Sequence, residues 1–160
     1  MPASKYIRIR PLKVSDFAFI RRLASKKTNF TVPPPYVLWL LKQTNSPSCM
    51  VAEHAKHGPV GYLLAILVGT QKGKVLYVWQ LATSKNGLSA GAIHDLLLAL
   101  RSFMRRTQVQ KIFFTAVPKS PELRAIRRYA YSLFGAALRA QQIVPSSISR
   151  GEREFMVRVK

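Results

Sequence analysis

The spacing of hydrophobic residues changes several times along this chain, and each change predicts a new element. Residues 6–10 alternate hydrophobic with basic side chains, which predicts a strand that stops at Pro11. Ser15 is a good helix cap, and the hydrophobic positions after it recur at helical spacing as Phe17, Ile20, Leu23 and Ala24. A second helix is predicted at 36–43, where the prolines 33–35 suit its entry.

The middle of the chain predicts three successive strands. The hydrophobic runs 49–55 and 59–69 flank a short turn that contains Gly58, which is typical of a hairpin. A second glycine-containing turn, 70–74, leads to a third run at 75–83. The rest of the pattern predicts, in order, a helix at 88–104, a strand at 111–118, a helix from Ser120 through Phe134, a weaker strand near 142–144 and a final strand at 154–160.

This order of elements predicts an α+β fold. We expect one mixed, largely antiparallel sheet of six to seven strands with about four helices packed on it. The strand–helix–strand crossover at 75–117 requires its two strands to run parallel. With 160 residues, of which 48% are hydrophobic, the chain can build one well-buried core but not two, so we expect a single domain over 1–160.

The charge of the chain is extreme. It has 26 Lys and Arg against 6 Asp and Glu, a formal net charge of +20, whereas about 2 to 8 charges suffice to keep a small domain soluble. An anionic partner is indicated: nucleic acid, an acidic membrane surface or a polyphosphate cofactor. A solvated basic surface without a partner is the alternative. Basic residues cluster at helical spacing as Arg21, Arg22 and Lys26, as Arg101 and Arg105, and as Arg124, Arg127 and Arg128.

Three features of the sequence bear on the compartment of the protein and on the state of its cysteine. Its longest apolar run, 60–68, is too short for a membrane span, and the basic N-terminal residues do not suit a signal peptide. Cys49 is the only cysteine, so an internal disulfide is excluded and we expect this thiol in the core. We therefore expect a cytoplasmic protein with no membrane span and no metal.

A strand, a polar turn with two glycines and a helix follow one another over 76–103. Free backbone N–H groups and a partial positive charge make a helix start of this kind a cradle for phosphate or pyrophosphate. A helix start that binds nothing is the alternative interpretation.

Four segments, taken in order and spacing, resemble the GNAT superfamily of acetyl-CoA-dependent N-acetyltransferases: 6–23, 49–67, 78–100 and 113–134. Within the superfamily, "LYVWQLAT" and "FFTAVPKSPE" are most similar to the 2,4-diaminobutyrate acetyltransferases of ectoine synthesis. The resemblance implies the GNAT-like acyl-CoA N-acyltransferase fold and acetyl-CoA as co-substrate. It also implies direct attack by a primary amine within a ternary complex.

The resemblance further implies a set of cofactor contacts. The main chain at Leu81, Ala82 and Thr83 would pair with the pantetheine arm, and the next turn would bind pyrophosphate through Asn86, Gly87, Leu88, Ser89, Ala90 and Gly91. The chain departs from the family where Asn86 replaces Arg or Gln and Ser89 replaces glycine, and its turn is about two residues short. This degenerate turn leaves a second interpretation open, a nucleic-acid-binding or otherwise non-catalytic relative.

Proton transfer in such a reaction needs a donor and a base. The resemblance implies Tyr129 as the donor to the departing thiolate, with Tyr131 as second choice and a buried structural tyrosine as the alternative. No general base is evident, because Gln80 stands where many relatives have glutamate and an amide takes no proton. Water, His54 or His94 would then serve.

The acceptor pocket is predicted from aromatic residues. Tyr36, Trp39, Trp79 and Gln80 would line it, although aromatic residues at this spacing also suit a core. A diamino acid needs carboxylates to hold its amines, and segment 28–41 has none. This absence argues against a diaminobutyrate-like small amine and leaves an amine on an anionic macromolecule as the other candidate acceptor. The sequence also leaves a homodimer open.

Overall fold

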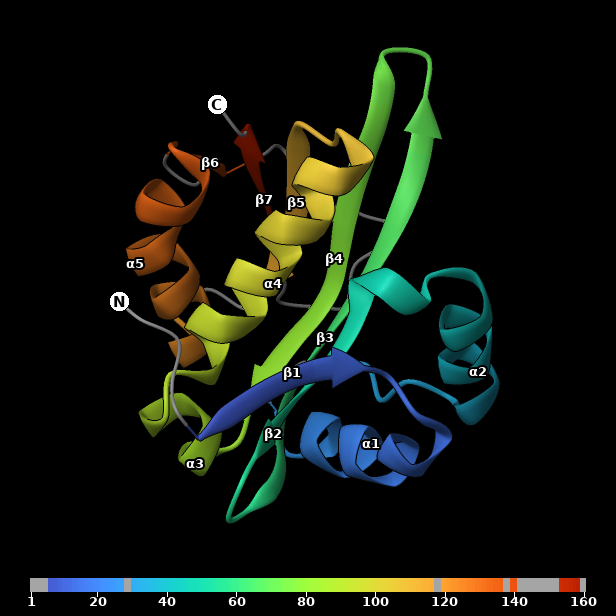
Figure 1. The fold of residues 1–160 in the computed structure, drawn as a ribbon, viewed down its shortest axis with the longest axis vertical. Coiled ribbons are helices and arrows are strands. Elements are labelled where there is room, and N and C mark those ends of the chain that lie inside the picture. Colours follow the sequence, from blue (N-terminus) through green and yellow to red (C-terminus); the bar gives the residue numbers. More distant parts are fainter. Residues whose placement is uncertain (1–5, 28–29, 117–118, 137–138, 141–152, 159–160) are drawn as a thin grey trace.

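The computed structural model describes residues 6–27, 30–116, 119–136, 139–140 and 153–158 of the chain. Within them one sheet has the order β1-β2-β3-β4-β5-β7-β6 (Figure 1). Its strands are β1 Ile7–Pro11, β2 Cys49–His54, β3 Gly58–Thr70, β4 Gly73–Thr83, β5 Lys111–Ala116, β6 Arg139–Ala140 and β7 Arg153–Arg158. The helices are α1 Phe17–Ser25, α2 Pro35–Thr44, α3 Lys85–Ser89, α4 Ala92–Thr107 and α5 Pro121–Phe134, with 3-10 turns at Val14–Asp16 and Ser46–Ser48.

The predicted α+β class and the mixed, largely antiparallel sheet are confirmed. Only the β4–β5 pair is parallel among the described strands, as the predicted crossover requires. The weaker strand expected near 142–144 lies outside the described residues. No helix in the described ranges is both long and apolar enough to cross a bilayer.

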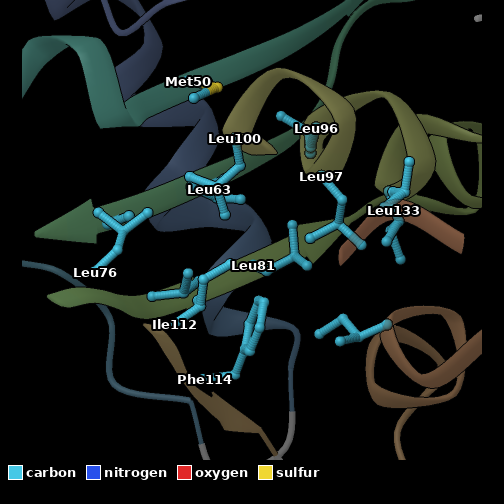
Figure 2. Packing of buried hydrophobic residues seen from close by; sticks show 14 of the residues in the cluster. Met50, Leu63, Leu76, Leu81, Leu96, Leu97, Leu100, Ile112, Phe114 and Leu133 are labelled. Carbon is cyan, nitrogen blue, oxygen red and sulfur yellow. The ribbon is translucent and has the colours of Figure 1, made fainter. Parts of the chain in front are cut away.

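Two hydrophobic clusters lie on opposite faces of the sheet. The larger one packs α4 and α5 on one face and includes Leu63, Leu76, Leu97 and Phe114 (Figure 2). The smaller one joins α1 and α2 to the other face through Ile20, Leu38, Tyr62 and Leu64. Over 49–52 of β2 and 62–65 of β3, alternate residues point to opposite clusters, which is why these stretches are hydrophobic throughout.

The helix predicted to start at Leu88 is two helices. Ser84 caps the short α3, since its side-chain oxygen accepts a hydrogen bond from the Gly87 N–H. The chain then breaks at Gly91, which has a φ of 78°, a left-handed conformation that glycine adopts without strain. The described chain consequently has five α-helices where about four were predicted.

The register between β3 and β4 shifts by one residue at Trp79. Leu64 pairs with Gln80 and Ala65 pairs with Val78, so Trp79 is an extra residue in β4. Such a bulge reverses the facing of the residues beyond it. Leu81 therefore enters the cluster under α4, and the Gln80 side chain is directed to the α1 side.

A charged network ties β1 to β2 and to the start of α1. The Arg10 guanidinium donates two hydrogen bonds of 2.8 Å to the buried Asp16 and one of 2.7 Å to Glu53. This last hydrogen bond, together with the nearby positive charges, holds the pKa of Glu53 below its ordinary value of 4.5.

Gly87 is where α3 packs against β3. It is buried, and a Cβ placed there would lie 2.3 Å from the Val60 carbonyl oxygen. Since backbone cannot yield as a flexible side chain can, a glycine is required at this position. Gly69, in β3, has nothing within 4 Å of such a Cβ.

We expect Gly87→Ala to destabilise the protein by about 1–3 kcal/mol, because the added methyl overpacks against backbone. Gly69→Ala is the matched control and should change stability by less than about 1 kcal/mol. Urea unfolding monitored by circular dichroism measures both. A Gly87→Ala variant as stable as the parent would contradict the packing described for α3.

The Glu53 contribution to stability should depend on pH. Because the pKa of Glu53 is lowered in the folded protein, its stabilisation is complete above pH 4.5 and is lost as the pH falls through the folded pKa. The difference in unfolding free energy between parent and Glu53→Gln should therefore shrink between pH 6 and pH 3. Lys85→Gln, which removes an exposed charge that does not act on Glu53 and leaves Arg8 and Arg10 in place, should keep the pH dependence of the parent. A difference that stays constant with pH would contradict the assignment.

Candidate active site

The two parallel strands at the centre of the sheet diverge into a fork. They pair from Val75 and Lys111 up to Val78 and Phe114, and no pairing follows, although β4 continues to Thr83 and β5 to Ala116. At the start of the fork, the Thr115 hydroxyl donates a hydrogen bond of 2.7 Å to the Trp79 carbonyl. Beyond this point one edge of β4 is no longer paired with β5.

The antiparallel ladder with β3 decides which backbone groups face the fork. The Ser84 N–H donates to the Val60 carbonyl at 2.8 Å, so the backbone groups of Ser84 and, two residues earlier, Ala82 face β3. Those of Leu81 and Thr83 point the other way, into the fork. Of the three residues predicted to pair with a pantetheine arm, Leu81 and Thr83 present their main chain there and Ala82 does not.

The predicted pyrophosphate turn is mostly helical. Four of its amides are engaged locally: Gly87 N–H bonds Ser84 Oγ, and the N–H groups of Leu88, Ala90 and Gly91 bond the carbonyls of Ser84, Asn86 and Leu88. Asn86 and Ser89 are exposed, and Ala90 is half-buried. Free donors occur instead at the next helix, because the Asp95 N–H is the first in α4 that reaches a carbonyl, that of Gly91. The amides of residues 92–94 therefore have no acceptor within α4.

A cavity of about 300 Å³ lies beside this first turn of α4. Leu88, Gly91, Ile93 and His94 line it on one side. Residues of α5 line it on the other side, namely Pro121, Arg124, Ala125, Arg128 and Tyr129. Two guanidinium groups and a helix N-terminus thus share one cavity, which is the combination that binds phosphate groups.

Tyr129 is held within this cavity wall. Its ring meets the buried His94 ring edge to face, with centroids 4.9 Å apart, and the Arg128 guanidinium carbon lies 5.8 Å from its centroid. His94 Nδ1 lies 3.1 Å from an oxygen of the buried Asp95. Tyr131, the second choice, is 72% exposed and does not line the cavity.

A lysine bridges the elements on either side of the fork. Lys27, just beyond α1, donates a hydrogen bond of 3.0 Å to the Thr83 carbonyl and forms an ion pair with the buried Glu122 of α5. Both contacts join residues more than fifty positions apart. The sequence pattern did not predict them, because no local spacing links Lys27 to Glu122.

The four residues predicted to bind an acceptor do not form one pocket. Gln80 is 1% exposed, and its amide is used twice: it accepts from the Tyr62 hydroxyl at 2.9 Å and donates to the Thr31 carbonyl at 2.6 Å. Trp79 is half-buried against the smaller cluster. Tyr36 and Trp39 are more than half exposed on α2 and do not line the cavity between α4 and α5.

The contacts of Cys49 and His54 suit a structural role rather than a catalytic one. Burial raises the pKa of the Cys49 thiol to about 11, and its Sγ donates to the Ala65 carbonyl, so it is a poor nucleophile. His54 Nδ1 accepts the N–H groups of Lys56 and His57 in the β2–β3 turn.

Sequence reasoning missed Arg124 and Arg128 as neighbours of Tyr129. It grouped them only as a basic helical face. Their spacing of four and the adjacent tyrosine were visible in the sequence, but nothing in it places them opposite the first turn of α4.

Comparisons with solved structures identify the fold. Diaminobutyrate acetyltransferase EctA from Paenibacillus lautus, in complex with L-2,4-diaminobutyric acid and coenzyme A, matches over 96% of this chain and 95% of its own, at 20% identity and a TM-score of 0.72. Ard1 from Thermoplasma volcanium matches over 97% and 99%, at 17% identity and a TM-score of 0.70. A chain of the NatC complex bound to Gag peptide and CoA matches over 97% and 99%, at 14% identity and a TM-score of 0.76.

No family model and no curated protein sequence matches this chain. Its fold is nevertheless that of the GNAT acetyltransferases, as the sequence resemblance predicted, and a diaminobutyrate acetyltransferase is among its structural neighbours. At identities of 14–20% this likeness establishes the fold and leaves the chemistry to be argued from the site.

Proposed function

We propose that this protein is an N-acetyltransferase that moves an acetyl group from acetyl-CoA to a primary amine in a ternary complex. The observation that carries the proposal is the fork between β4 and β5, which opens beside a cavity with two arginines and the start of α4. The fold is shared with EctA and with a NatC chain, both solved with coenzyme A.

The residues present fit coenzyme A in two respects. An extended pantetheine arm needs main-chain partners, and the fork offers the backbone of Leu81 and the N–H of Thr83, whose carbonyl already accepts from Lys27. A pyrophosphate needs donors and positive charge, which the amides of residues 92–94 and the side chains of Arg124 and Arg128 supply. This assignment places the pyrophosphate one helix later than the sequence pattern did, because α3 uses the amide of Gly87 for its own cap.

When bound, acetyl-CoA supplies an acetyl group already activated as a thioester. Transfer to an amine then needs a donor to the carbonyl oxygen and a proton for the thiolate. The Leu81 N–H, which faces the fork just beyond the bulge, is our choice for the first role. The Tyr129 hydroxyl is our choice for the second, and water is the base, since Gln80 is fully engaged and cannot accept a proton.

The four acidic residues whose side chains the structure describes bear on the choice of acceptor. Asp16 and Glu53 bond to Arg10, Glu122 pairs with Lys27, and Asp95 contacts His94. None of these four carboxylates is left to bind a substrate ammonium group. We therefore favour an amine carried by an anionic molecule over a diaminobutyrate-like acceptor.

Calorimetric titration of nucleic-acid-free protein with acetyl-CoA tests the cofactor site. We expect saturable one-to-one binding that persists in high salt and exceeds binding of ATP, an anion control. Arg124→Gln and Arg128→Gln should each weaken binding about 10- to 100-fold, since each removes a charged hydrogen bond. Arg127→Gln, on the same helix but outside the cavity, is the matched control. Binding no better than ATP and lost in salt would refute the proposal and favour a non-catalytic relative.

Removal of the Tyr129 hydroxyl tests its role in proton transfer. We expect Tyr129→Phe to lower turnover about 100-fold or more while the acetyl-CoA dissociation constant stays within a few-fold. Tyr131→Phe, which alters an exposed hydroxyl two residues away, should leave turnover unchanged. Thiol release with a panel of primary amines measures both. Unchanged turnover in Tyr129→Phe would remove this residue from the mechanism.

A further inference from the structure

A second cavity, of about 530 Å³, lies at the end of the sheet opposite the fork. The β3–β4 turn and the segment that joins α4 to β5 form its walls. Polar residues of these segments line it: Gln71, Lys72, Lys74, Gln108, Gln110 and Lys111. In Figure 1 this end of the β3–β4 hairpin extends beyond the helices.

Aromatic and aliphatic side chains form the floor of this cavity. Val75 and Phe113 line it, and Tyr77, the register partner of Phe113, lies on the same face of the sheet. Their neighbours Leu76 and Ile112 point to the α4 side and are fully buried. Val75, Tyr77 and Phe113 are all half-buried, and neither hydrophobic cluster includes them. This face of the β4–β5 pair is therefore not covered by the described helices.

The residues that line this cavity have the chemistry of a surface that binds nucleic acid. Three lysines match phosphates, and three carboxamides both donate and accept hydrogen bonds, as base edges require. The Phe113 ring offers a face on which an unpaired base can stack. An acidic peptide would use the lysines but not this combination of carboxamides with an aromatic floor.

The surrounding charge also favours a polyanion. None of the residues that line the cavity is acidic, and the four acidic residues whose side chains are described are paired elsewhere. No residue in the described lining thus neutralises the three lysines, within a chain of net charge +20. Such a field attracts nucleic acid in a salt-dependent way.

We propose that this cavity and its floor, which we call the hairpin surface, bind single-stranded nucleic acid. The surface is separate from the cofactor site, because β4 has 11 residues and its two ends lie about 33 Å apart at about 3.3 Å per residue. The proposal therefore does not depend on acetyltransferase activity. It does fit an acceptor amine that is carried on, or held near, a nucleic acid.

Fluorescence anisotropy with labelled 12-nucleotide oligouridine and the DNA of equal length tests the proposal, at two salt concentrations. We expect Lys72→Gln/Lys74→Gln/Lys111→Gln to weaken binding at least 10-fold. The salt slope should fall by about 2, because each phosphate that a lysine neutralises on a single strand adds about 0.7 to it. The matched control, Lys13→Gln/Lys26→Gln/Lys56→Gln, makes the same change of charge at exposed positions elsewhere and should weaken binding less than 3-fold.

Phe113→Leu separates stacking from charge. It should weaken binding about 5- to 10-fold, as expected when a base–aromatic stack is removed, and leave the salt slope unchanged. If this variant fails to fold by circular dichroism, the lysine variants still decide the question.

Three results would overturn the proposal. They are equally weakened binding in both lysine variants, absence of binding by the parent protein, and polyglutamate of equal charge competing as well as the oligonucleotide. Acetyl-CoA titration of the same variants, in which we expect no change, distinguishes failure here from failure of the cofactor site.

Discussion

One extra residue in β4 sets the geometry on which the candidate site depends. Because the register shifts at Trp79, Leu81 enters the core under α4 while Gln80 turns to the opposite face. A bulge also bends its strand and increases the local twist, and the pairing of β4 with β5 ends at the adjacent residue, Val78. A main-chain edge for an extended ligand thus arises from one irregularity in a regular sheet.

Buried polar contacts hold the fork on both sides. On the α1 side, Gln80 has its amide satisfied by Tyr62 and Thr31. Across the fork, Lys27 joins the last residue of β4 to Glu122 at the start of α5. Leaving such groups unpaired in a buried site costs more than the bonds themselves contribute. The fork is therefore a specified arrangement of these elements rather than a frayed edge.

The distribution of charge has a simple internal cause. The carboxylates of Asp16, Asp95 and Glu122 are buried and engaged, and Glu53 bonds to Arg10. The described surface is consequently basic over both ends of β4. An anionic cofactor at one end of β4 and a nucleic acid at the other end would contact different residues, because the two cavities share none of their lining.

The sequence by itself determined the periodic features. Hydrophobic spacing located the central strands and the long helices, and the crossover from 75 to 117 required parallel pairing, because these properties depend on neighbouring residues. Only the tertiary structure decided the bulge at Trp79, the burial of Gln80, the contact of Gly87 with Val60 and the meeting of Arg128 with the start of α4. Each of these depends on packing between residues far apart in the chain, and local spacing carries no record of such packing.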